Sequence, residues 1–282
     1  MRENRADRLR GAMGLTCRGT AAGGLSGFLG TEPFSGDPTQ KIAMPSDDLE
    51  RLTSEIITCR KCPRLVRYRE WVARTKRAAF RDWEYWGRPV PGWGDPAARL
   101  LVVGLAPAAH GGNRTGRAFT GDRSGDWLYR ALYRAGFANR PTTISRDDGL
   151  ELRDCYIVAA VRCAPPANKP TRAEFARCQP YLEREAMLLP NLRVVVALGG
   201  VAMAAFLRAW RSTGHAVPTP APKFRHGAIS SLSRITLIAS YHPSQRNTQT
   251  GLLKEAMFDN VFRSARYILE KASDSGRPPS VG

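Results

Sequence analysis

Four short apolar runs, separated by helical patterns, constrain the fold of this chain more than any other feature. The runs span Arg99 to Gly104, Tyr156 to Val161, Val194 to Leu198 and Ile235 to Ala239. The helical patterns lie between them, over Gly125 to Gly136, Thr171 to Leu189 and Gly200 to Arg211. Continuous apolar runs indicate strands buried on both faces, and their alternation with helices predicts parallel strands with right-handed crossovers. The sequence therefore predicts an α/β fold with three layers, α/β/α, around a central four-stranded parallel sheet.

One domain is expected to hold most of the 282 residues, because 43% of them are hydrophobic, enough for a substantial core. We place this domain at residues 46–271, from a helix start at Ser46 to the end of an amphipathic helix over Leu252 to Lys271. Residues 1–45 are rich in Arg and Gly without a sustained period, which predicts a disordered or misassigned extension, with Met44 as an alternative start. Residues 272–282 are expected to form a polar tail.

Charge and cysteine content narrow the partners and the compartment. The chain has 43 Lys and Arg against 25 Asp and Glu, a net charge of +18, which indicates a polyanionic partner such as nucleic acid. The alternative explanation of this net charge is a general basicity of the organism's proteins. The sequence contains no apolar stretch of membrane-spanning length. Six cysteines without a convincing signal peptide favour the cytoplasm, and a metal site rather than a disulfide framework.

A long loop rich in Gly, Ala and Pro follows the first apolar run at Gly104. Ligands of open α/β sheets bind beside the carboxyl ends of the strands, so this loop is predicted to line the active site. It ends near Asp122 and Ser124, either of which can cap a helix that begins near Gly125. A purely structural connection is the alternative, but the length of the loop and its Phe119 favour a function.

A second polar segment, ASYHPSQRNTQTG, follows the fourth apolar run directly. It places His242 at the end of a strand and Arg246 in the loop beyond it. Because parallel strands end at the same edge of a sheet, His242 is predicted to reach the crevice beside the Gly104 loop. A structural role is the alternative for this histidine.

Four cysteines have the distribution of a metal site. Cys59 and Cys62 form a C-x-x-C pair, Cys163 follows the second strand, and Cys178 lies in the next helix. Four thiolates suit zinc or a four-iron cluster, and the gap of about a hundred residues between the halves argues against a compact zinc knuckle. A redox dithiol and ordinary buried thiols are the alternatives. Cys155, at the start of the second strand, is expected to be a core thiol.

The ordered combination of these motifs resembles a known family. GLAPAAHG, GRAFTGDRSG, VRCAPPANKP and YHPSQRN, together with the early C-x-x-C, are similar to the iron–sulfur branch of the uracil-DNA glycosylase superfamily, and most similar to its type 5 members. The resemblance covers residues 49–268. It implies a structural [4Fe-4S] cluster on Cys59, Cys62, Cys163 and Cys178, and removal of uracil, and of deaminated bases such as hypoxanthine, from double-stranded and single-stranded DNA. We expect a cytoplasmic, nucleoid-associated monomer.

The resemblance also implies roles for individual residues. Cleavage of the glycosidic bond passes through a cationic sugar and an anionic base, so His242 is expected to stabilise the leaving base. Asn168 would read the base edge. Asp122 would orient water or stabilise the sugar, although a helix cap alone is nearly as good an interpretation. One departure stands out, because type 4 relatives carry an acidic residue at the position of Leu105.

The remaining implied contacts are with the base and the DNA backbone. Phe119 resembles the ring on which a flipped base stacks. The residues expected to bind the base are Gly104, Ala106, Ala108, His110, Phe119 and Ser244, and those expected to enter the DNA groove are Gln245, Arg246 and Asn247. The basic segment Lys61 to Arg81, predicted to be helical from Pro63, would contact phosphates.

Besides a redox protein that uses the C-x-x-C pair, two other classes of protein remain open from the residues. A non-catalytic nucleic-acid-binding protein with an iron–sulfur or zinc site would share the charge and the cysteines, but it would not need His242 facing a Gly-rich loop. A zinc-dependent hydrolase would need ligands around an open position, and the four histidines show no H-x-x-x-H spacing.

Overall fold

Six strands form one sheet in the computed structural model, which describes residues 47–274. Their order across the sheet is β1-β3-β2-β4-β6-β5. The strands are β1 (Trp93–Gly94), β2 (Leu100–Gly104), β3 (Cys155–Ala159), β4 (Val194–Leu198), β5 (Ile229–Leu232) and β6 (Ile235–Ser240). The four central strands run parallel, whereas β1 and β5 pair antiparallel at the two edges. The predicted four-stranded parallel sheet is therefore the centre of a larger, mixed sheet.

The four central parallel strands were predicted, but the two edge strands were not, because both lack a continuous apolar run. β1 has only two residues, too few to show a period. β5 contains Ser230 and Ser231 and buries only Leu232. A strand paired on one side and open to solvent needs few apolar residues, so a search for buried runs does not find it.

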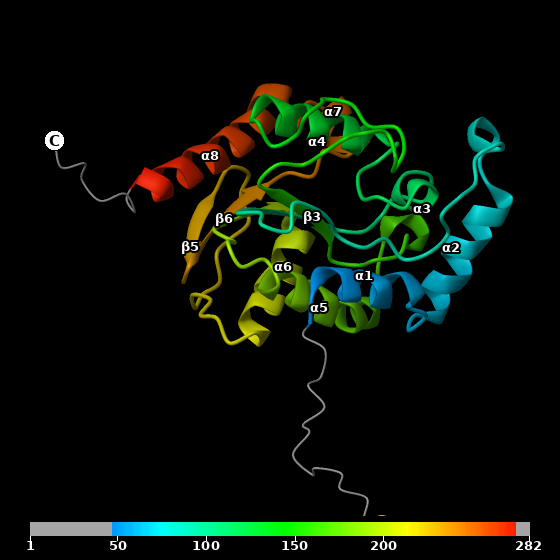
Figure 1. The fold of residues 1–282 in the computed structure, drawn as a ribbon, viewed down its shortest axis with the longest axis horizontal. Helices are drawn as coiled ribbons and strands as arrows, with labels where there is room; N and C mark the ends of the chain where they lie inside the picture. Colours follow the sequence, from blue (N-terminus) through cyan, green and yellow to red (C-terminus); the bar gives the residue numbers. More distant parts are fainter. Residues whose placement is uncertain (1–46, 275–282) are drawn as a thin grey trace, which may run out of the picture. The chain divides into compact units, whose positions relative to one another are not determined.

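Helices cover both faces of the sheet (Figure 1). The longer ones are α1 (Leu49–Thr58), α2 (Pro63–Thr75), α4 (Arg123–Arg134), α5 (Arg172–Met187), α6 (Gly200–Ser212) and α8 (Glu255–Asp274). The short ones are η1 (Ala78–Phe80), α3 (Gly112–Thr115), η2 (Pro166–Asn168) and α7 (Gln245–Gln249). α4 and α8 pack on one face, α5 and α6 on the other, and α1 lies against α5. The predicted three-layer α/β/α architecture is confirmed.

The core consists of two apolar layers, one on each face of the sheet. Leu100 and Val102 of β2 face α4 and α8, whereas Leu101 and Val103 face α5 and α6. All residues of β2, β3 and β4 are buried. This two-sided burial explains why the central strands read as uninterrupted apolar runs.

Two predicted helix boundaries differ from the structure. The helix from Pro63 ends at Thr75 rather than Arg81, because Lys76 has a positive φ of 53°, which is incompatible with continuing the helix. The last helix begins at Glu255 rather than Leu252 and continues to Asp274, past the predicted domain end at residue 271. The predicted N-terminal extension and the rest of the tail, residues 1–46 and 275–282, lie outside the described residues. None of the described helices is long and apolar enough to cross a membrane.

Candidate active site

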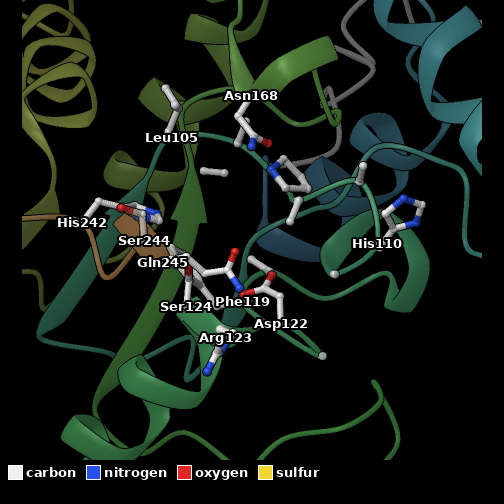
Figure 2. A pocket seen from close by; sticks show the side chains of 18 of the residues that line it. Leu105, His110, Phe119, Asp122, Arg123, Ser124, Asn168, His242, Ser244 and Gln245 are labelled. Carbon is white, nitrogen blue, oxygen red and sulfur yellow. The ribbon is translucent and has the colours of Figure 1, made fainter. Parts of the chain in front are cut away.

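A pocket of about 990 Å³ opens at the carboxyl ends of the central strands. Leu105 after β2, Ala159 at the end of β3 and His242 after β6 all line it. Most of the predicted site residues also line it, namely Ala106, Ala108, His110, Phe119, Asp122, Asn168, Ser244, Gln245 and Arg246. Figure 2 shows Asn168, His242 and Asp122 on different sides of this pocket. The Gly104 loop and the His242 segment therefore share one crevice.

His242 lies beside the Phe119 ring, with 5.9 Å between the ring centroids and an interplanar angle of 33°. Its backbone carbonyl accepts a hydrogen bond of 2.8 Å from the side-chain amide of Asn247. Burial lowers the pKa of His242 to about 4. At neutral pH the imidazole is therefore uncharged and carries one N–H donor.

Phe119 is held in a conformation that few non-glycine residues adopt, with φ of 55°. Its ring lies against Gly104, where a Cβ atom would stand 2.7 Å from Cζ, and its carbonyl lies against Gly125, where a Cβ would stand 1.7 Å from the oxygen. Ala167 and Asn168 also have positive φ and also line the pocket. Such strain persists only where packing enforces it, and it concentrates at functional sites.

Asp122 both caps a helix and lines the pocket. Its Oδ1 accepts the backbone N–H of Gly125 at 3.0 Å, at the start of α4. The carboxylate packs over Gly111, where a Cβ atom would stand 2.1 Å from Oδ2. Burial raises the pKa of Asp122 above its usual range. The capping role and the active-site role of this residue are thus compatible.

Two buried arginines anchor the loop between His110 and Asp122, and the sequence interpretation missed both. Arg114, 3% exposed, donates from Nε to the His110 carbonyl at 2.8 Å and from Nη2 to the Gly121 carbonyl at 2.9 Å. Arg117, 4% exposed, forms an ion pair of 2.7 Å with Asp148. The sequence feature that could have identified these two arginines is their position among small residues in a loop that follows a strand.

His110 and Arg114 connect this loop to the segment that follows α2. The His110 Nδ1 is 3.0 Å from the Tyr85 hydroxyl, and burial lowers the pKa of the imidazole. The Arg114 guanidinium contacts the rings of Phe80 and Trp83, 4.0 Å from each centroid. Cation–π contacts of this kind compensate part of the cost of burying the charge.

The predicted DNA-contacting residues divide into two groups. Gln245 and Arg246, at the start of α7, are exposed and line the pocket. Asn247 does not line it, since its amide binds the His242 carbonyl and its backbone N–H donates to Ser244 Oγ at 3.3 Å. The structure thus gives Asn247 and Ser244 a part in holding the His242 segment.

Three of the four predicted metal-binding cysteines, Cys62, Cys163 and Cys178, share one buried cluster. Cys59 packs in the adjoining cluster, beside Tyr181. Ala106 packs against the first cluster and also lines the pocket, so the thiols lie behind the pocket wall. Burial raises the pKa of Cys163 to about 12 and that of Cys178 to about 11. Within residues 47–274, no three His, Cys, Asp or Glu side chains form a ready site for a single metal ion.

Buried positive charge near the thiols fits an anionic group. Arg69 is 2% exposed; its Nη2 donates to the Cys59 carbonyl at 3.4 Å and lies 3.8 Å from Glu70, but its Nε and Nη1 have no hydrogen-bond partner among the described residues. The charge of Arg69 acts on Cys163, and the backbone N–H of Arg162 donates to the Cys178 sulfur. A buried guanidinium with unused donors is costly unless negative charge lies nearby. Four thiolates around an iron–sulfur cluster would supply that charge.

The comparisons with known proteins agree with this geometry. The family model of the uracil DNA glycosylase superfamily matches residues 91–266. The type-5 uracil-DNA glycosylase of Mycobacterium tuberculosis is 52% identical over 219 residues, 77% of this chain and 80% of that protein. That of Thermus thermophilus is 50% identical over 222 residues, 78% of this chain and 98% of that protein.

Type-4 relatives are less similar to this chain than type-5 relatives. The type-4 uracil-DNA glycosylase of Sulfurisphaera tokodaii is 30% identical over 155 residues, which cover 54% of this chain and 55% of that protein. The type-5 relatives are thus more similar and matched over more of the chain. The chain belongs to the uracil-DNA glycosylase superfamily, and within it to the type 5 branch.

Proposed function

We propose that this chain is a DNA-repair enzyme that flips uracil out of DNA and hydrolyses its N-glycosidic bond. The bond from the base nitrogen to the sugar breaks, the hydroxyl of water joins the sugar, and the water proton neutralises the released base. The observation that carries the proposal is the meeting of Phe119, Asp122, Asn168 and His242 around one pocket, in a chain whose relatives are named uracil-DNA glycosylases.

His242 stabilises the leaving base in this proposal. Negative charge develops on the pyrimidine oxygens as the bond breaks. The N–H of the neutral imidazole donates a hydrogen bond to one of these oxygens and stabilises the charge. One pre-oriented donor of this kind contributes on the order of a hundred- to a thousandfold in rate. The lowered pKa of His242 keeps the imidazole neutral over the physiological range.

Asp122 acts on the sugar and the attacking water. It is the single carboxylate among the described residues that line the pocket, and Leu105 occupies the position where type 4 relatives carry an acid. A carboxylate beside a cationic sugar lowers the energy of the transition state, and it orients a water molecule through a hydrogen bond.

Phe119 and Asn168 select the substrate. A flipped base stacks on the Phe119 ring, which lies beside His242. The Asn168 amide, exposed at the pocket, offers a donor and an acceptor to the base edge. Since stabilisation of a leaving base is not specific to uracil, release of hypoxanthine belongs to the proposal. Gln245 and Arg246 enter the groove vacated by the base.

The test of this function is base release by the purified full chain. Duplexes with uracil opposite guanine, and single strands with uracil, should yield free uracil and abasic sites that break in alkali. The same sequences with cytosine in place of uracil serve as the control. An iron-loaded preparation that releases no uracil from either substrate would contradict the proposal.

We further propose that Cys59, Cys62, Cys163 and Cys178 hold a structural [4Fe-4S] cluster. When bound, the cluster would cross-link three parts of the domain, namely α2, α5 and the segment that follows β3. It would take no part in base release. The purified protein should contain iron and sulfide and absorb broadly near ~400 nm. Cys163→Ser should lose iron and unfold, because ligation is part of the folding free energy. Cys155→Ala, which alters a core thiol outside the set, should keep its iron. Zinc without iron in the wild type is the contrary result.

The cellular setting follows from the proposed substrate. An enzyme that repairs chromosomal DNA would work in the cytoplasm, in association with the nucleoid. We propose that the protein acts as a monomer. Sedimentation at working concentration would measure the oligomeric state.

A further inference from the structure

We propose that the exposed face of α2, formed by Arg67, Trp71 and Arg74, is a stacking platform for an unpaired nucleotide beside the excised base. Tyr68 connects this α2 face to the pocket. The occupant is the strand that carries the uracil, so the inference rests on the proposed function and deepens it. It adds a specific preference for unpaired DNA.

The α2 helix has two contrasting sides. Leu65, Val66, Arg69 and Val72 are buried against the domain. Arg67, Trp71 and Arg74 are exposed, and spacings of four and three residues place them on one side of the helix. The Trp71 side chain is 53% exposed. In Figure 1, α2 stands at the edge of the domain opposite α8, where a strand can reach it.

The α2 face continues directly into the pocket. Tyr68 lines the pocket, and its ring centroid is 6.0 Å from that of Trp71 with an interplanar angle of 31°. Arg77 and Phe80, just after α2, line the same pocket. A strand whose base occupies the pocket therefore meets Tyr68 at the pocket edge and Trp71 beyond it.

Charge identifies the occupant as nucleic acid. Neither Arg67 nor Arg74 forms an ion pair with another described residue, and Glu70 on the same helix is paired with Arg60. Two unpaired guanidinium groups beside one exposed indole provide phosphate contacts next to a stacking surface. Proteins that bind single-stranded nucleic acids combine phosphate contacts with aromatic stacking in this way. Each stacked base contributes a binding free energy large enough to be measured.

The α2 helix is also fixed in place, as a platform requires. Cys62 is its N-cap, and Arg64 in its first turn forms an ion pair of 2.7 Å with the buried Glu174 of α5. Bases inside a DNA duplex are already stacked on each other and are not free to stack on Trp71. A rigid aromatic side chain on the protein surface therefore binds an unpaired base more strongly than a paired one. The α2 face should therefore favour single strands over duplexes.

The test is binding of the full chain to a fluorescein-labelled, uracil-free oligonucleotide, measured by anisotropy as a single strand and as a duplex. Trp71→Ala should weaken single-strand binding roughly five- to twentyfold, and duplex binding by much less. Trp71→Phe should retain most of the affinity. The slope of log affinity against log salt should not change in Trp71→Ala, whereas Arg67→Ala should flatten it by about 0.7 on single strands.

Tyr267→Ala is the matched control, because Tyr267 is 56% exposed on α8. It should leave both affinities unchanged. Unaltered single-strand binding by Trp71→Ala, or equal losses on single strand and duplex, would overturn the proposal. So would a concentration-dependent oligomer of the wild type that Trp71→Ala disperses, since the α2 face would then bind protein. Binding does not require base release, so a chain that binds through Trp71 but frees no uracil would refute only the proposed function.

Discussion

The two walls of the pocket are held in place by different kinds of interaction. The loop from His110 to Asp122 is anchored by Arg114 and by the buried Arg117–Asp148 ion pair. The His242 segment is held by neutral hydrogen bonds, from Asn247 to the His242 carbonyl and from the Tyr241 backbone N–H to a ring nitrogen of His226. Full charges fix one wall, and uncharged groups fix the other.

This difference suits the chemistry proposed for each wall. Burial raises the pKa of Asp122, and hydrogen bonds from the backbone N–H groups of Gly125 and Ser124, with a smaller contribution from the charge of Arg114, offset only part of that rise. Burial alone lowers the pKa of His242, without a contribution from a charged neighbour. A carboxylate beside the imidazole would raise its pKa and promote its protonation, and no charged group among the described residues contributes to the pKa of His242 in this way.

The largest expected effect comes from the charged wall. Arg117→Met should lower the free energy of unfolding by about 3–5 kcal/mol, because Asp148, only 11% exposed, loses its buried partner. Urea unfolding measures the change. The control is Arg134→Met, which removes more exposed ion pairs with Glu255 and Asp259 and should cost far less. Equal, small losses for both variants would show that the ion pair does not hold this wall.

The next effect concerns the neutral wall and the chemical step. His242→Ala should lower the single-turnover rate of uracil release about a hundred- to a thousandfold, the range expected when one donor to a developing anion is removed. Stability should change little by comparison with Arg117→Met. Asp122→Ala should cost about as much, because the carboxylate acts on the water and the sugar, and a much smaller loss would leave Asp122 only its capping role. A full rate for His242→Ala together with complete loss in Asp122→Ala would reverse the assigned roles.

The sequence predicted the walls themselves better than the groups that support them. The apolar runs of β2, β3, β4 and β6 and the polar segments after them follow from local pattern, because burial on both faces leaves a continuous signal. The role of Arg117 does not follow from local pattern, because its burial depends on an ion pair with Asp148, which lies 31 residues further along the chain. The edge strands β1 and β5 were missed for a related reason, since their pairing is set by neighbours rather than by their own apolar content.

A third prediction concerns the pH dependence of stability. The pKa of His242 is about 4 in the folded protein, against 6.5 for an unperturbed histidine. Between these values the unfolded state binds more protons, so His242 contributes stability above pH 6.5 that is lost as the pH falls towards 4. His242→Gln should remove about 3 kcal/mol of that loss. Urea midpoints of both proteins across this window provide the measurement, and parallel curves would exclude the buried neutral imidazole. His110, His215 and His226 supply a background common to both proteins.

The smallest effect separates positioning from chemistry within the neutral wall. Asn247→Ala removes one hydrogen bond to the His242 carbonyl, and should cost only about 1 kcal/mol in the free energy of unfolding. Its single-turnover rate should still fall, by about two- to tenfold, because a small displacement of His242 weakens a hydrogen bond that must align in the transition state. In a background of His242→Ala, Asn247→Ala should have no further effect on the rate, since it acts through the imidazole. An undiminished rate in the single variant, or a second full loss in the double variant, would mean that the neutral wall does not depend on this hydrogen bond.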